Sequence, residues 1–137
     1  MTDKQYEAEK KRINVALTKW LDKLFLVHWK IKVNFERDNF ETYHKGGEKL
    51  VDENVIACIS PDDNYLTATL TFFLRVTKSR TDEEIEEDVV HELMHVFVAP
   101  MSNQENRKSE ERTVVGLART FLRIDKQHEK TISKLSK

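Results

Sequence analysis

The sequence predicts an α+β fold in a single domain spanning residues 1–137. Three segments, 3 to about 27, 82–98 and 109–122, carry apolar residues at intervals of three and four, as amphipathic helices do. The segments between the first two helices alternate apolar and polar residues, or are rich in threonine and aromatic residues, as strands are. We therefore expect an N-terminal helix, a small and mainly antiparallel three-stranded sheet, and two further helices.

The first helix is expected to pack on the sheet through one apolar face, with charged residues on the opposite face. That face comprises Ile13, Leu17, Trp20, Leu21, Leu24 and Phe25. Lysine, arginine, aspartate and glutamate are mixed on its polar side, which favours packing in a globular protein over binding at a membrane surface.

Three strands are expected next. Residues 29–36 alternate strictly, which indicates a strand with one buried face. A second strand is expected around 55–59 and a third over 65–76, separated by a turn at 60–64. The polar residues 37–52 indicate a long loop or an extended hairpin connection. Because short polar turns favour antiparallel pairing, the sheet should be mainly antiparallel. One face of the third strand should be buried: Leu66, Ala68, Leu70 and Phe72.

The second long helix has clear start and stop signals. Thr81 and Glu84 form a predicted capping box, and acidic residues fill the first turns, where the helix dipole favours them. Pro100 ends the segment, because the residue before a proline is pushed out of the helical region. Residues 82–98 are therefore expected to be helical and, from their many valines, largely buried.

This helix contains the pattern H-E-x-x-H as His91, Glu92 and His95. Two histidines four residues apart lie on one face of a helix, so both imidazoles can bind the same Zn²⁺. The glutamate between them can act as a general base towards water activated by that metal. The pattern predicts a zinc hydrolase. Co²⁺ or Mn²⁺ could replace zinc in vitro.

A third protein ligand is expected, since catalytic zinc usually has three. After a polar loop at 102–108, the helix over 109–122 begins with Glu110 and Glu111. Glu111 precedes the apolar Val115 by one turn and is the preferred ligand, but Glu110 precedes Val114 in the same way and stays an alternative. Either glutamate could instead only complement the helix dipole.

These features resemble the gluzincin metallopeptidases. The V-V-H-E-L-x-H segment and the following E-E-x-x-V helix are similar to those of the minimal minigluzincins and of small zincin-like proteins of phages and prophages, over about residues 29–123. The resemblance implies that His91, His95 and Glu111 bind zinc, that Glu92 is the catalytic base, and that the substrate is a peptide or protein. Val115 stands where thermolysin-like enzymes have an aspartate that orients the first histidine. Asp88 is a candidate for that task; a solvated acidic turn is the alternative.

Other residues are weaker candidates. Tyr43 and His44 are candidate donors to a developing oxyanion, although each is better explained as an ordinary loop residue. His128 is a weaker candidate, because it lies about 17 residues beyond Glu111 on the same expected helix. The segment 124–137 is expected to continue the last helix with a solvated lysine face, or to cover the active site as a latency device. The rival to a peptidase is a zinc-stabilised, non-catalytic or latent interaction protein.

Composition limits the partners and the cellular location that the sequence predicts. Net charge is −1, which gives no argument for nucleic-acid binding. No stretch is long and apolar enough to span a membrane, and residues 1–5 lack an apolar signal segment, so a cytoplasmic protein is expected. The single cysteine, Cys58, excludes an intramolecular disulfide and is expected to be a small core residue.

Overall fold

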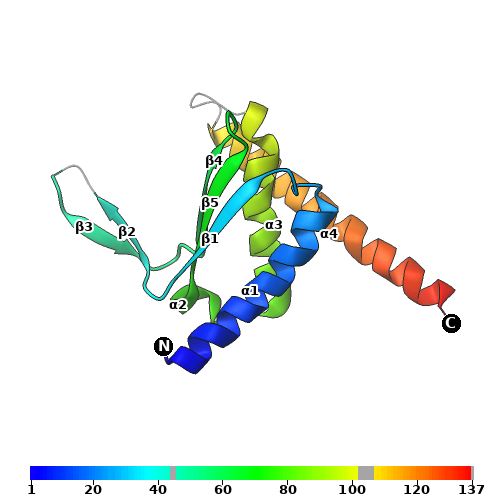
Figure 1. Cartoon of the computed structure of the whole chain (residues 1–137), viewed down its shortest axis with the longest axis horizontal. Coiled ribbons are helices and arrows are strands. Elements are labelled where there is room, and N and C mark those ends of the chain that lie inside the picture. The colour runs from blue at the N-terminus through cyan, green and yellow to red at the C-terminus, as the bar shows by residue number, and fades with distance from the viewer. Residues whose placement is uncertain (44–45, 102–106, 137) are drawn as a thin grey trace.

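The computed structural model describes residues 1–43, 46–101 and 107–136, and it confirms the α+β class (Figure 1). The helices in this part of the chain are α1 (Asp3–Lys23), α2 (Leu74–Thr77), α3 (Asp82–Val98) and α4 (Arg107–Leu135), with a 3-10 turn at Ala99–Met101. The strands are β1 (Lys30–Glu36), β2 (Phe40–Tyr43), β3 (Lys49–Asp52), β4 (Ala57–Asp62) and β5 (Thr67–Phe73). Helix α3 packs against α1, α4 and β4, so it is the central element of the fold.

Helix α1 is shorter than expected. Thr2 caps its first turn, and the helix ends at Lys23 because the chain turns at Phe25, whose φ is 55°. Phe25 is 79% exposed, so its predicted place on the buried face was wrong. Leu26 and Trp29 are buried in the connection that follows. The remaining predicted members of the face are buried or partly buried: Ile13, Leu17, Trp20, Leu21 and Leu24.

The main sheet is mixed, with the strand order β1-β5-β4. Strands β4 and β5 are antiparallel, as the short turn between them predicts. Strands β1 and β5 are parallel, from Lys30 opposite Thr67 to Glu36 opposite Phe73, so the expectation of a mainly antiparallel sheet was wrong for this pair. The turn argument applies only to strands that follow each other directly. A long connecting segment separates β1 from β5. It is long enough for the chain to cross back, so that β5 can run parallel to β1.

Part of the chain between β1 and β5 forms a hairpin, which was one of the two alternatives expected for residues 37–52. Strands β2 and β3 pair antiparallel, from Phe40 opposite Asp52 to Tyr43 opposite Lys49, and they extend away from the main body (Figure 1). The expected third strand over 65–76 is shorter in the structure, since its last residues form α2. Leu66 is partly exposed in the preceding turn with φ of 52°, which corrects its predicted burial. The rest of that face is buried: Ala68, Leu70 and Phe72.

Strand β4 continues through Pro61 to Asp62, where a turn over 60–64 was expected. Phe73 N–H donates to Ile56 C=O at 2.9 Å, and this fixes which residues of β4 bond to β5. Hydrogen-bonded and non-hydrogen-bonded pairs alternate in an antiparallel ladder, so Pro61 lies where a backbone N–H would point away from β5. Proline fits this place because β4 is an edge strand of the sheet.

Helix α3 has the predicted bounds. Thr81 Oγ1 accepts the N–H of Glu84 at 3.2 Å, and the Glu84 carboxylate accepts the N–H of Thr81 at 2.8 Å, which completes the capping box. The buried side chains of this helix are Ile85, Val89, Val90, Leu93, Met94, Val96 and Val98. The histidine pattern therefore lies on a helix whose opposite side is embedded in the core.

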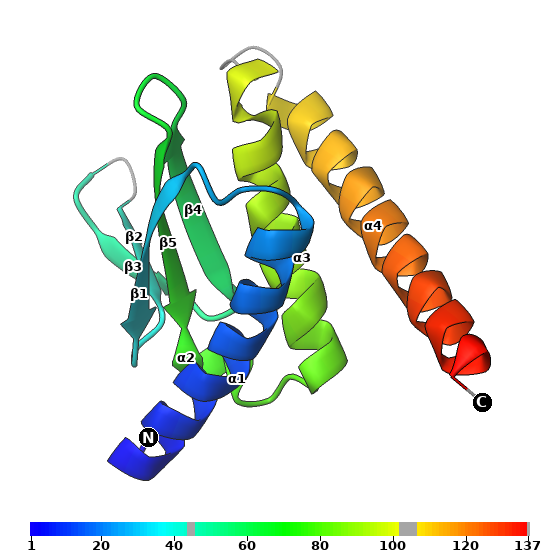
Figure 2. The same ribbon diagram turned by 45° about the vertical axis from the view of Figure 1, so that its right-hand side comes forward.

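Helix α4 begins at Arg107, two residues earlier than expected, while residues 102–106 lie outside the described part of the chain. It continues without a break to Leu135, and its C-terminal half extends away from the body in both views (Figures 1 and 2). Ile124 and Leu135 are exposed and do not cover α3, as the latency alternative would require. Among the described residues, no helix has the length and apolarity needed to cross a membrane.

Candidate metal centre

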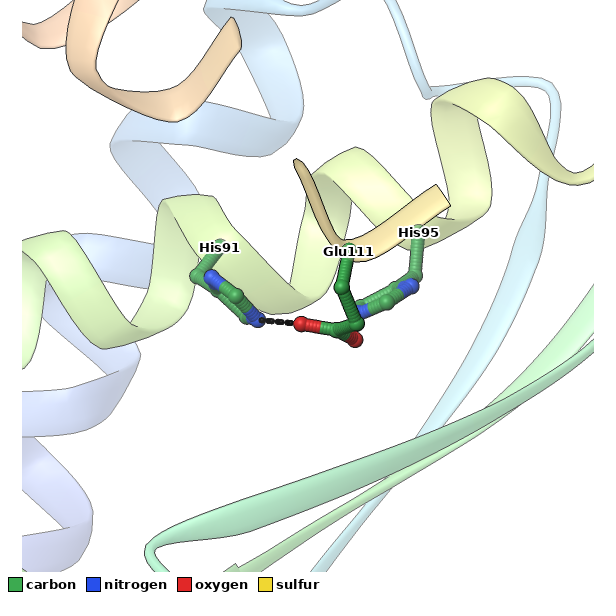
Figure 3. Close-up of side chains that lie close together, drawn as sticks. All are labelled: His91, His95 and Glu111. Atoms are coloured by element: carbon green, nitrogen blue, oxygen red, sulfur yellow. Dashed lines mark ion pairs between the residues drawn. The ribbon is translucent and has the colours of Figure 1, made fainter. Parts of the chain in front are cut away.

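His91 and His95 lie one turn apart on the face of α3 that contacts α4 (Figure 3). Their ring centroids are 5.2 Å apart, and the rings are inclined by 71°. Both side chains are only partly exposed. Burial lowers the pKa of His91, so its imidazole is held in the neutral form that binds metals. The predicted spacing thus brings the two imidazoles together.

Glu111, in the first turns of α4, reaches both rings (Figure 3). Its Oε1 lies 2.9 Å from His95 Nε2, and its Oε2 lies 3.6 Å from His91 Nε2. One donor atom from each of the three residues lies within 4.8 Å of the others. Ligands about 2.1 Å from a tetrahedral zinc ion are separated by roughly 3.4 Å. Two nitrogens and one carboxylate oxygen at these separations fit the donor chemistry and the size of Zn²⁺.

Glu110 contacts the other side of the second histidine. Its Oε1 lies 3.1 Å from His95 Nδ1, whereas Glu111 lies at Nε2. The Glu110 side chain is 18% exposed and that of Glu111 is 58% exposed. In the tautomer that donates from Nδ1 to Glu110, Nε2 is left with a free lone pair for a metal. From the sequence, Glu110 was expected only as an alternative metal ligand or as a partner of the helix dipole. Adjacent helical residues differ by about 100° in direction, and this difference was the available signal.

Asp88 has a different partner from the one that the sequence suggested, which was His91. Its carboxylate accepts two hydrogen bonds from Arg80, from Nε at 3.0 Å and from the terminal nitrogen at 2.8 Å. It is therefore neither a solvated turn residue nor, within the described part of the chain, hydrogen-bonded to His91. Burial raises the pKa of Asp88, and the Arg80 guanidinium partly offsets that effect. The Arg80–Asp88 pair connects the loop before α3 to the helix one turn before the first histidine.

Glu92 lies on the side of α3 that faces β4. A cleft of about 290 Å³ is lined by residues 55–57 together with Asp88, His91 and Glu92. Burial raises the pKa of the Glu92 carboxyl to about 7, against a smaller opposing effect of His95. The same carboxylate raises the pKa of the partly buried Cys58 thiol, although burial contributes more. Glu92 is thus a poorly solvated carboxyl group beside the two histidines.

Strand β4 is the sheet edge nearest this cleft, whereas β5, the third of the expected strands, lies in the middle of the sheet. The hydrogen-bond alternation directs the backbone groups of Ala57 and Ile59 away from β5. These groups give the cleft an edge with which an extended chain can pair.

Of the side chains of the remaining candidates, the structure places only that of His128. The side chain of Tyr43 and all of His44 are outside the described part of the chain. His128 follows Glu111 by 17 residues on the same unbroken helix, which is about 25 Å along its axis. It is therefore too far away to contact a group held by the three candidate ligands.

Comparisons with protein-family models, with curated proteins and with solved structures give no match to this chain. The resemblance to gluzincins therefore stays a prediction from the residues that carry it.

Proposed function

We propose that this protein is a zinc-dependent peptidase of the gluzincin type. The observation that supports the proposal is the convergence of His91, His95 and Glu111. Two of them come from α3 and one from α4, so the group forms only when these two helices pack together. Three protein ligands with a mixed nitrogen and oxygen donor set are typical of catalytic zinc sites, which keep one position for water or substrate.

Glu92 is the proposed proton carrier. When bound, zinc would act as a Lewis acid that polarises a substrate carbonyl and makes water more acidic. Glu92 accepts a proton from the water whose oxygen bonds to the carbonyl carbon. It then delivers that proton to the amine nitrogen as the C–N bond breaks. The position of Glu92 in the cleft beside His91 supports this role.

The substrate is proposed to bind in an extended conformation along β4. The outward backbone groups of Ala57 and Ile59 can exchange hydrogen bonds with a peptide strand. This pairing brings the peptide bond past the cleft that contains His91 and Glu92. It holds substrates of different sequence by their shared backbone, so side-chain selection must come from other surfaces.

Metal content is the first test. Wild-type protein is expected to hold one zinc ion per chain, measured by plasma mass spectrometry after identical purifications. His95→Ala and Glu111→Ala remove donor atoms and should lose the zinc. The matched control is His128→Ala, which removes an exposed histidine from α4 and should retain zinc. A wild-type protein that takes up no zinc even when zinc is supplied would overturn the proposal.

Cleavage is the second part of the same test. Glu92→Gln should keep its zinc but lower the hydrolysis of fluorescently labelled casein by at least about 100-fold, because proton transfer is removed. Hydrolysis by Glu92→Gln at the wild-type rate would exclude the mechanism. Acetohydroxamate binding separates the rival function. A zinc-loaded protein that binds no hydroxamate and cleaves nothing would be the metal-stabilised interaction protein instead.

A further inference from the structure

A second cavity adjoins the candidate metal centre on the side of α4. It has a volume of about 630 Å³, within the range of ligand sites, and it lies between α3 and α4. The two helices diverge towards the C-terminal end of α4 (Figure 2). His91 and Asp88 line both this cavity and the cleft beside β4. The candidate metal centre therefore borders both spaces.

Four basic side chains form one wall of this cavity. We define them as the basic row: Arg119, Arg123, Lys126 and Lys130. Their spacings of four, three and four residues place them on one face of α4. All four are exposed, and none makes an ion pair with another described residue. In contrast, the lysines of α1 that face α4, Lys19 and Lys23, are both paired with Asp125.

The opposite wall carries less charge. Glu87 and Asp88 are the carboxylates that line the cavity, and Asp88 is neutralised by its two hydrogen bonds with Arg80. Four cations thus face one carboxylate that has no ion pair within the described residues. Such an excess creates a positive potential that attracts anionic groups.

An apolar strip lies beside the basic row and contributes to the same cavity. It consists of Val115, Ala118 and Leu122. Among the residues that the structure describes, no phenylalanine, tyrosine or tryptophan lines the cavity, so these residues offer no aromatic surface on which bases could stack. A wall with adjacent apolar and basic side chains fits a peptide with apolar and acidic residues better than it fits a nucleic acid.

The distance of the basic row from Glu111 determines which positions of a bound peptide it can contact. Arg119 follows Glu111 by eight residues and Lys130 follows it by 19, which correspond to about 12 Å and 28 Å along the helix. An extended peptide advances about 3.3 Å per residue. A substrate that pairs with β4 on one side of the cleaved bond and continues past His91 into this cavity on the other side would therefore meet the row about four to nine residues from that bond.

We propose that the basic row selects substrates with acidic side chains about four to nine residues from the cleaved bond. This inference rests on the peptidase function proposed above. Backbone pairing along β4 accepts many sequences, and the basic row adds the side-chain preference that such pairing lacks. The apolar strip accepts the apolar residues between the acidic ones.

Peptide binding tests the row without requiring cleavage. The probe is a fluorescein-labelled 14-residue peptide that alternates glutamate and leucine, with matched peptides carrying glutamine or lysine in place of glutamate. Full-length protein is expected to bind the glutamate peptide about tenfold or more tightly than the glutamine peptide, measured by fluorescence anisotropy. Raising the salt from 0.05 M to 0.5 M should remove most of this preference, because the pairs are exposed to solvent.

Two variants with the same change in net charge give the control. The test variant replaces the basic row: Arg119→Gln, Arg123→Gln, Lys126→Gln and Lys130→Gln. The control variant replaces four exposed basic residues on β1, in α2 and at the residue after α2: Lys30→Gln, Lys32→Gln, Arg75→Gln and Lys78→Gln. The first should lose the tenfold preference and the second should keep it, with both remaining folded by circular dichroism because all eight side chains are exposed.

The outcomes separate the two proposals. Equal binding of the glutamate and glutamine peptides, or equal losses in both variants, would overturn the basic row as a specific site. Tighter binding of a single-stranded DNA of equal charge, lost only in the test variant, would overturn the peptide and assign a nucleic acid. Retained acidic-peptide binding by a zinc-free or inactive protein would support the row while the peptidase proposal fails. An active enzyme that cleaves acidic and neutral peptides equally would overturn the row alone.

Discussion

At the residue scale, the two adjacent glutamates of α4 make different contacts with the histidines. Glu111 faces the Nε2 atoms of both histidines, while Glu110 contacts Nδ1 of His95 from behind. A carboxylate behind a ligand histidine fixes the ring orientation and makes the metal-binding nitrogen more basic. Both side chains of that pair are mostly buried, so the contact is poorly screened by water.

Glu110→Gln is therefore expected to weaken zinc binding by about 10–100-fold without abolishing it. Glutamine can still accept a hydrogen bond from Nδ1, but it no longer increases the basicity of the ring. Competition with a chromophoric zinc chelator measures the affinity. Glu83→Gln, an exposed residue in the first turn of α3, is the control and should bind zinc as the wild type does. Complete loss of zinc in Glu110→Gln, with retention in Glu111→Ala, would reverse the two assignments.

At the element scale, the position of the histidines depends on where α3 begins. The Thr81 hydroxyl oxygen accepts a hydrogen bond from the N–H of Glu84, and the Glu84 carboxylate accepts one from the N–H of Thr81. The following turns pack into the core, so a frayed start would loosen the helix that carries both histidines. The capping interaction thus stabilises the fold and the candidate site together.

Thr81→Ala is expected to lower the free energy of unfolding by about 1 kcal/mol, because it leaves the N–H of Glu84 without its side-chain acceptor. Urea titration monitored by circular dichroism measures the change. Thr120→Ala, in the exposed middle of α4, is the matched control and should be neutral or slightly stabilising, since alanine has the higher helix propensity. Equal effects of the two substitutions would exclude the capping explanation.

Features encoded by short sequence segments could be predicted. The bounds of α3 and the approach of the two histidines follow from capping and helical spacing within the helix itself. The parallel pairing of β1 with β5 could not be predicted, because it depends on how the chain returns after a long excursion. The exposure of Phe25 depends on a left-handed turn that its sequence context does not require.

The candidate site also combines features that local sequence predicts with features that depend on how distant segments pack. The preference for Glu111 used the direction of each side chain around one helix. The partner of Asp88 is Arg80, in the loop before the helix, and a helical pattern does not describe that loop. Lys126 and Lys130 were expected on a solvated face, and only the packing of α3 beside α4 shows that they line a cavity.

At the scale of the whole molecule, an ionic network connects three helices. Lys19 of α1 contacts Glu86 of α3 at 2.6 Å and Asp125 of α4 at 2.9 Å. Lys23 also pairs with Asp125, and Trp20 Nε1 donates to Glu86 at 2.7 Å. Asp125 is only 8% exposed, so its charge depends on the two lysines. The network holds α4 in place beyond the turns that carry Glu111.

Asp125→Asn is expected to lower the free energy of unfolding at pH 7 by about 2 kcal/mol, because two charge-assisted hydrogen bonds are lost from a buried carboxylate. Urea titrations from pH 7 to pH 3 measure this difference. Asp63→Asn, in the exposed turn after β4, is the control and should change little.

The difference should depend on pH in a defined direction. Burial alone would raise the pKa of Asp125, but the hydrogen bonds from Lys23 and Lys19 hold it below the ordinary value of 3.8. The stabilisation is therefore complete above about pH 4 and is lost as the pH falls through the lower pKa of the folded protein. A difference between wild type and Asp125→Asn that grows on acidification would contradict the network.

The mixed sheet has a consequence for the order in which its strands come together. Pairing β4 with β5 closes a loop of residues 63–66, whereas pairing β1 with β5 closes a loop of residues 31–66. Because the entropy of loop closure grows with the logarithm of length, the second closure costs about 2 kcal/mol more than the first. Forming the β4–β5 hairpin thus has the lower entropic cost, so this hairpin is the favoured folding nucleus. Detaching β1 from β5 regains more chain entropy than detaching β4 does. Strand β1 lies at the edge opposite β4, so the sheet can lose it without opening the cleft at Glu92.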